Sequence, residues 1–184
     1  MSLFEPIFAA LNRAQIRYVV VGGFATVLHG HARLTADIDI VIDLSPEQAR
    51  RALEALLALG FRPRAPVDPL AFADPSIRRQ WATEKGMRVF ALWDPANPMR
   101  EVDLFAEHPM DFEELWRGSE VVEAGVTDEA GGERAPENWE AGWEAHRVHQ
   151  LTLALAATPA QRVAWLEEMI ALAWLVGALP KSRA

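Results

Sequence analysis

The chain has no cysteine among its 184 residues, and it has only two lysines and one tyrosine. The absence of cysteine excludes disulfides, thiolate metal sites and cysteine nucleophiles, and it favours an intracellular protein. No uncharged apolar run reaches the roughly 18 residues that a membrane helix needs, and the first residues lack the basic and apolar regions of a signal peptide. We therefore expect a soluble, cytoplasmic protein that has no membrane partner.

Composition limits the size of the fold and the kind of partner. Hydrophobic residues make up 51% of the chain, which is enough for one good core with an appended helical piece. The formal net charge is -8, and this opposes non-specific attraction to nucleic acid, because that attraction needs a basic surface. It does not exclude a local basic patch.

Hydrophobic periodicity predicts a chain that contains both strands and helices. The expected strands are 18–21, 37–42, 87–93 and 100–105, with a further strand at 121–126. The expected helices are 4–11, 24–30, 45–60, 77–83 and 111–116, and residues 64–74 are expected to be rich in turns. At the start of the third helix, Ser45 and Gln48 have the spacing of a capping box. Residues 94–98 have the composition of the turn of a β-hairpin.

The C-terminal part of the chain differs in character from the rest. Residues 127–136 form an acidic, glycine-containing linker, and residues 137–184 have the pattern of a helical hairpin. We therefore expect a first domain at 1–126, then the linker, then the hairpin. The second hairpin helix is apolar nearly all round, so either a homodimer or a lid folded back on the first domain would bury it.

The most informative stretch joins a Gly-Gly turn to a pair of acids. Gly22 and Gly23 follow an apolar strand, and Asp37 and Asp39 lie on the next strand. Side chains alternate faces along a strand, so both carboxylates are on one face and the intervening isoleucine is on the other. Two carboxylates held together in this way favour a divalent cation such as Mg²⁺. The glycines allow a backbone to approach phosphates closely.

These residues, in this order, resemble the nucleotidyltransferase superfamily with the DNA polymerase β-like fold. The family signature is an apolar strand, Gly-Gly or Gly-Ser, a helix, and then Asp-x-Asp on the next strand. The string from Arg33 through Thr35 to Asp37 and Asp39 looks like the small bacterial branch related to abortive-infection and toxin-antitoxin nucleotidyltransferases. The family's third carboxylate lies on a later strand, where Asp103 is the matching residue. The resemblance covers roughly residues 3–126, and it implies an α+β fold in which a mixed β-sheet is flanked by helices.

The resemblance implies a reaction and a set of site residues. A nucleoside monophosphate would pass from a nucleoside triphosphate to a hydroxyl acceptor, on an RNA end or a protein, with Mg²⁺ in a two-metal site. The metal-binding and catalytic residues would be Asp37, Asp39 and Asp103, and the nucleotide-binding residues would be Gly22, Gly23, Arg33 and Thr35. A toxin-antitoxin role would add an antitoxin partner, bound through the C-terminal helices.

One departure from the family pattern keeps alternatives open. Relatives commonly follow the last strand with a lysine-bearing helix and a Gly-Arg-x-x-Asp segment that help to hold the triphosphate. Here that stretch is absent, and Lys85 is the only lysine before the linker. Triphosphate binding would then depend on a partner or on arginines, for which the candidates are Arg33, Arg78, Arg79 and Arg88. A catalytically silent binding protein and an aminoglycoside- or lincosamide-type small-molecule transferase remain as alternatives.

Overall fold

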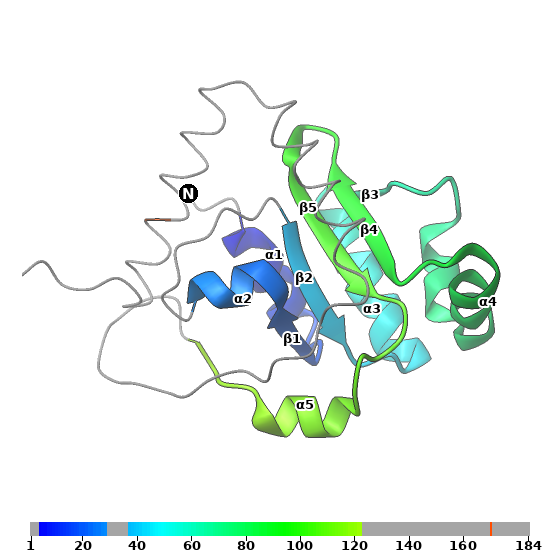
Figure 1. Cartoon of the computed structure of the whole chain (residues 1–184). Helices are drawn as coiled ribbons and strands as arrows, with labels where there is room; N and C mark the ends of the chain where they lie inside the picture. The colour runs from blue at the N-terminus through cyan, green and yellow to red at the C-terminus, as the bar shows by residue number, and fades with distance from the viewer. Residues whose placement is uncertain (1–3, 29–36, 123–169, 171–184) are drawn as a thin grey trace, which may run out of the picture.

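The computed structural model describes residues 4–28, 37–122 and 170 of the chain. Five strands form one sheet in the order β1-β2-β5-β4-β3, and β2 and β5 run parallel while the other neighbours are antiparallel (Figure 1). The strands are β1 (Tyr18–Val21), β2 (Asp37–Ile42), β3 (Arg62–Pro63), β4 (Val89–Asp94) and β5 (Asn97–Phe105). Helices flank this sheet, so the predicted α+β class with a mixed sheet is confirmed.

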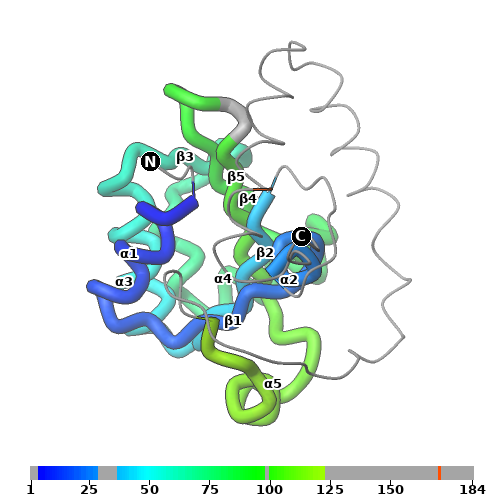
Figure 2. The backbone as a smooth tube through the Cα atoms, turned by 90° about the vertical axis from the view of Figure 1, so that its left-hand side faces the viewer, coloured from blue at the N-terminus to red at the C-terminus, as the bar shows by residue number. Residues whose placement is uncertain are grey.

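One face of the sheet is the apolar core. The isoleucines of β2 and the alternate residues Val102 and Leu104 of β5 are fully buried on it. Helices α1 (Glu5–Arg13) and α3 (Pro46–Ala58) lie together on one side of the strands (Figure 2). Both begin with proline in the first turn, where the missing N–H is no loss. The buried stripe of α3 is Ala49, Ala52, Leu53 and Leu56.

The opposite face of the central strands is also closed to solvent, which the sequence pattern did not predict. Alternation with Val102 and Leu104 predicts that Glu101 and Asp103 point outward from β5, but they are only 2% and 4% exposed. All six residues of β2 are buried as well. In contrast, the residues of β1 are half-buried, although an apolar run is typical of a buried strand, because β1 is at the edge of the sheet.

The helix boundaries differ from expectation where local hydrogen bonds decide them. Helix α2 (Gly22–Leu28) begins at the first glycine of the Gly-Gly pair. The expected turns at 64–74 include a 3-10 helix, η1 (Pro69–Ala73). Helix α4 (Pro75–Lys85) begins two residues early because the carboxylate of Asp74 accepts a hydrogen bond from the Ser76 N–H at 2.7 Å.

Two sequence predictions are wrong. The capping box at Ser45 does not form, because Oε1 of Gln48 instead accepts the N–H of Arg17 at 3.1 Å. Beyond α5 (Phe112–Gly118), Val121 and Val122 belong to no strand and are 87% and 40% exposed. The rest of the strand expected at 121–126 is outside the described residues.

The linker at 127–136 and the hairpin at 137–184 are also outside the described residues, apart from Ile170, which is helical and 47% exposed. The linker and the helical hairpin therefore remain untested predictions. Among the residues that the structure does describe, no helix has the length and apolar character to cross a membrane.

Candidate metal centre

The parallel pairing of β2 with β5 brings four acidic residues to one face of the sheet. Asp39 is opposite Asp103 in the register, and Asp37 is opposite Glu101. Within each strand the acids are two residues apart, so alternation places all four side chains on the face away from the isoleucines. The structure therefore brings Asp37, Asp39 and Asp103 together on one face, as the sequence predicts.

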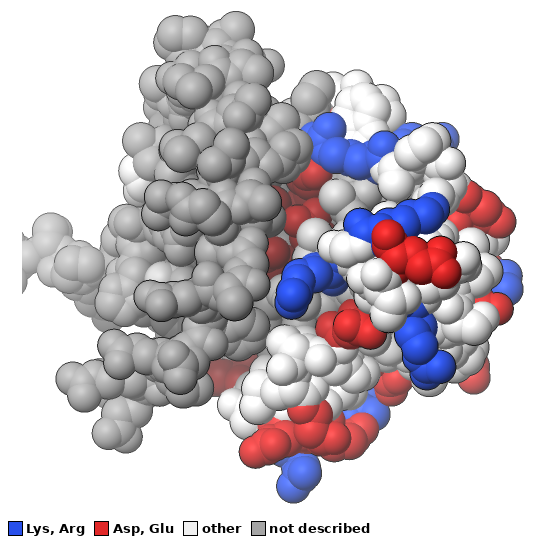
Figure 3. All heavy atoms as spheres, turned by 45° about the vertical axis from the view of Figure 1, so that its right-hand side comes forward, with Lys and Arg blue, Asp and Glu red and all other residues white. Residues whose placement is uncertain are grey.

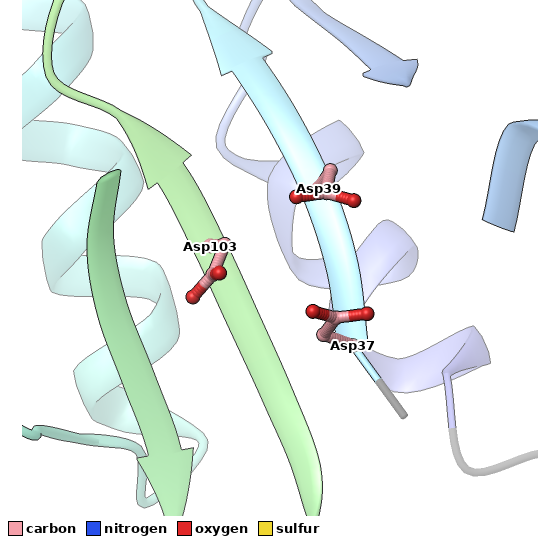
Figure 4. Close-up of side chains that lie close together, drawn as sticks. All are labelled: Asp37, Asp39 and Asp103. Carbon is pink, nitrogen blue, oxygen red and sulfur yellow. The ribbon is translucent and has the colours of Figure 1, made fainter. Parts of the chain in front are cut away.

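The three aspartates are close enough to share a cation. One carboxylate oxygen from each lies within 4.8 Å of the others. Figure 4 shows Asp37 and Asp39 on β2 and Asp103 on the neighbouring β5, all on the same side of the two strands. Their exposed fractions are only 4%, 6% and 4%, respectively. The cluster is thus interior, unlike the solvated acidic groups of an ordinary protein surface.

Burial makes this cluster electrostatically demanding. Two unit charges up to 4.8 Å apart repel by at least about 3 kcal/mol at an effective dielectric constant near 20. Buried carboxylates have to be protonated, paired with cations, or bound to a metal. Three oxygen ligands from carboxylates fit a hard divalent cation, such as Mg²⁺ or Ca²⁺. The cluster could therefore bind a metal ion.

Gly22 lies directly against this cluster. Its φ of +68° is in the left-handed region, which favours glycine. A Cβ atom at this position would lie 2.9 Å from Cγ of Asp39, which is closer than real Cβ atoms approach. The first glycine of the predicted pair is thus required by the turn and by the neighbouring aspartate. Gly23 is buried in the first turn of α2.

Arg64 is a further charged residue at this face, and no sequence pattern pointed to it. Arg64 follows β3, and its guanidinium forms two hydrogen bonds with Glu101, from Nε to Oε1 at 2.5 Å and from Nη2 to Oε2 at 2.9 Å. These bonds raise the pKa of Arg64 above its ordinary value, and the charges of Glu101 and Asp103 raise it further, whereas burial lowers it. The sequence indicates only that Glu101 would need a cation if it were buried, and it does not identify Arg64 as that cation.

Arg78, one of the arginines that could have bound the triphosphate, bonds to backbone carbonyl groups instead. Arg78 is buried on α4, where its guanidinium donates to the carbonyl oxygens of Phe72 at 2.5 Å and Leu44 at 2.7 Å. Burial lowers its pKa, and its role is structural, so it is excluded as a phosphate contact. Arg33 and Thr35 are outside the described residues, and those predictions stay untested.

Charges on the surface are mixed. Arg79, Lys85 and Arg88 are exposed, and on the face shown in Figure 3 basic and acidic side chains alternate without a large patch of one sign. On this face, the described residues form no broad basic surface that would replace the absent lysine-bearing segment.

No model of a protein family matches this sequence, and a search of curated proteins likewise finds no match. The class of protein is therefore defined here by its fold and its site alone. It is an α+β protein in which a mixed sheet holds three buried aspartates that could bind a metal ion.

Proposed function

We propose that this chain is a Mg²⁺-dependent nucleotidyltransferase, which moves a nucleoside monophosphate from a nucleoside triphosphate to a hydroxyl acceptor on an RNA end or a protein. The observation that carries the proposal is the cluster of Asp37, Asp39 and Asp103, whose carboxylate oxygens lie within 4.8 Å of one another. The Gly-Gly turn beside it is the second support, because Gly22 keeps the space next to Asp39 clear of a side chain.

The same three aspartates would hold the Mg²⁺. When bound, Mg²⁺ would supply charge neutralisation to the phosphates and to the leaving pyrophosphate. The choice of Mg²⁺ over other hard cations rests on the resemblance to nucleotidyltransferases. The structure itself contains a donor set made only of carboxylates, which suits any hard divalent ion.

In the proposed reaction, the acceptor hydroxyl forms a bond to the α-phosphorus as the bond to pyrophosphate breaks. The hydroxyl proton passes to a carboxylate oxygen, for which Asp103 is the candidate because it comes from a different strand from the other two aspartates. Gly22 leaves room for the carboxylate of Asp39, since a Cβ at that position would overlap it.

The proposal is tested by transfer of a labelled nucleotide. The full chain is incubated with Mg²⁺, each labelled nucleoside triphosphate, and a mixture of RNA and protein acceptors. We expect Asp39→Asn to abolish transfer, and Glu54→Gln, an exposed change of equal charge on α3, to retain it. Transfer that persists in Asp39→Asn would refute the assignment of the centre.

Metal binding is measured independently of activity by thermal unfolding. Wild type should gain stability when Mg²⁺ is added, because the ion binds only the folded state. Asp39→Asn should lose this gain, because it removes one of the three carboxylates that would hold the ion. A variant that gains as much stability from Mg²⁺ as wild type does would contradict a metal role.

One observation supports a second candidate, a catalytically silent binding protein. Lys85, the lysine available to the first domain, is at the exposed end of α4. A chain that binds Mg²⁺ and nucleotide but transfers nothing to any acceptor, including a panel of aminoglycoside and lincosamide antibiotics, would favour this candidate. The toxin-antitoxin role and the dimer or antitoxin interface stay predictions about the C-terminal helices.

A further inference from the structure

Arg64 is held in one orientation at the edge of the acidic face. Two hydrogen bonds join its guanidinium to Glu101, and the same guanidinium lies over the ring of Trp93, 5.5 Å from the ring centroid. Its backbone N–H donates to the carbonyl oxygen of Ala91 at 3.0 Å. A side chain fixed by an ion pair and an aromatic ring loses little further freedom when it binds a ligand.

The position of Arg64 relates it directly to the metal centre. Ala91, to which its backbone is bonded, is opposite Asp103 in the register of β4 and β5. Glu101, to which its side chain is bonded, is opposite Asp37 in the register of β2 and β5. The charge of Asp103 contributes to the raised pKa of Arg64, so the two groups interact electrostatically.

Arg64 keeps a donor for a further anion. A guanidinium offers five N–H donors in a planar fork, and Glu101 takes the edge formed by Nε and Nη2. Nη1 makes no hydrogen bond to another described residue. The side chain of Arg64 is 32% exposed, whereas that of Glu101 is 3% exposed. The end of the fork can therefore meet a ligand from solvent while Glu101 stays covered.

We propose that Arg64 binds the phosphates of the substrate at this centre, with Glu101 as the positioning residue that orients it. This inference rests on the proposed function and names a residue for the role that the absent lysine leaves open. Four buried carboxylates would repel a triphosphate, and a cation beside them offsets part of their charge in addition to the metal. The guanidinium also matches two phosphate oxygens at once.

The alternative explanation is that Arg64 only neutralises the charge of Glu101. Single substitutions do not separate the two roles, because removing the arginine leaves a buried charge behind. The double variant Arg64→Gln with Glu101→Gln does, since it removes both charges together and keeps two amides that can hydrogen-bond. A purely structural role predicts that the double variant recovers phosphate affinity. A phosphate contact predicts that it stays weak.

The experiment is calorimetry on the full chain with Mg²⁺ and two probes, inorganic tripolyphosphate and α,β-methylene-ATP. We expect Arg64→Gln and the double variant to bind both probes about 10- to 100-fold more weakly than wild type. Arg64→Lys should recover part of the affinity, because the charge returns without the fork. Arg50→Gln, a change of an exposed arginine on α3, is the matched control and should bind as wild type does. Thermal unfolding of each variant establishes that it is folded.

The outcomes separate this inference from the proposed function. If the double variant binds both probes as tightly as wild type, Arg64 makes no phosphate contact and the inference is overturned. If Arg64→Gln binds the probes as tightly as the control Arg50→Gln, the inference is overturned too. Either result leaves the nucleotidyltransferase proposal standing. Wild type that binds neither probe in the presence of Mg²⁺ would overturn both.

Discussion

At the scale of single residues, the acidic face depends on the close packing of Gly22 against Asp39. Gly22 has two independent reasons to be glycine, its positive φ and the closeness of Asp39. Each reason alone would disfavour another residue, and together they join the shape of the turn to the position of a carboxylate. The residue thus connects backbone conformation with the metal centre.

Gly22→Ala is predicted to impair both stability and metal binding. The left-handed conformation costs a residue with a Cβ about 1–2 kcal/mol, and the added methyl group displaces Asp39 as well. Denaturant unfolding should show the loss of stability, and the stabilisation that Mg²⁺ gives to wild type should shrink. Gly118→Ala is the control, because a Cβ there meets open space. An alanine variant with wild-type stability and an unchanged response to Mg²⁺ would show that this turn is not constrained.

How far the site could be predicted depends on whether its geometry is local. The common face of Asp37 and Asp39 follows from strand alternation alone, and the structure agrees. The approach of Asp103 required the pairing of β2 with β5, which the sequence pattern suggested only through the order of the family motif. Arg64 could not be predicted, because its pairing with Glu101 depends on the order of β3, β4 and β5 in the sheet. No local sequence pattern gives that order.

At the scale of elements, arginines attach helices and loops to one another. Arg78 of α4 bonds to the carbonyl oxygens of Phe72 in η1 and Leu44 before α3, and its guanidinium lies over the Phe72 ring, 5.4 Å from the centroid. Two backbone acceptors in separate segments thus share one donor group. The sequence suggested this residue as a phosphate contact, because an arginine pattern does not reveal which carbonyls will be buried beside it.

Arg78→Met is predicted to weaken the fold without affecting the centre. The substitution keeps an apolar side chain but leaves two carbonyl groups without their donor, at a cost of about 2–4 kcal/mol. Urea unfolding measures this loss, and calorimetry should find Mg²⁺ affinity unchanged. Arg79→Met, which is exposed, should change stability by less than about 0.5 kcal/mol. A drop in Mg²⁺ affinity in folded Arg78→Met would contradict the structural role.

Arg17 attaches α5 to the sheet in a similar way. Its guanidinium lies 5.1 Å from the ring centroids of both Phe112 and Trp116, and it pairs with Glu113 at 2.7 Å and Asp43 at 3.4 Å. The hydrogen bond with Arg17 lowers the pKa of Glu113 below its ordinary value of 4.5. Cation-π contacts and ion pairs therefore act together on this short helix.

The lowered pKa gives a prediction with a definite sign. A carboxyl whose pKa is lower in the folded state stabilises the fold above its unfolded pKa, and this stability is lost as pH falls through the folded pKa. Wild type should therefore melt above Glu113→Gln at pH 7, and the difference should vanish below the depressed folded pKa, on the acid side of 4.5. The difference is small because the glutamate is exposed. Glu114→Gln is the control, and an equal effect in that variant would show that Arg17 is not the cause.

At the scale of the whole molecule, charge limits what the protein binds. The net charge is -8, and the face shown in Figure 3 has basic and acidic groups interspersed. A surface of this kind does not attract a polyanion over long distances. Any phosphate-bearing partner therefore has to be recognised at a local centre.

RNA binding is predicted to be weak and to depend on divalent ions. At physiological salt in EDTA, a fluorescently labelled RNA oligonucleotide should not change its anisotropy on addition of the protein. Any binding that appears with Mg²⁺ should disappear in Asp39→Asn. Tight, metal-independent binding with a steep dependence on salt would contradict this prediction.

The fold class could be predicted more completely than the arrangement of its parts. Alternating and helical periodicities identified the main strands and helices, because burial on one face produces them directly. The two-residue β3 and η1 could not be predicted, since neither is long enough to show a period. The burial of both faces of β2 also required the tertiary structure.

The pairing of Asp39 with Asp103 has a kinetic consequence. The two residues belong to distant parts of the chain and become neighbours only when β5 adds to β2, which is a slow, non-local step of folding. Their mutual repulsion is absent from the denatured ensemble and arises as that step is completed. Divalent ions present during refolding would thus act on the step that pairs β5 with β2, and the rate of that step would report on the centre before any substrate is added.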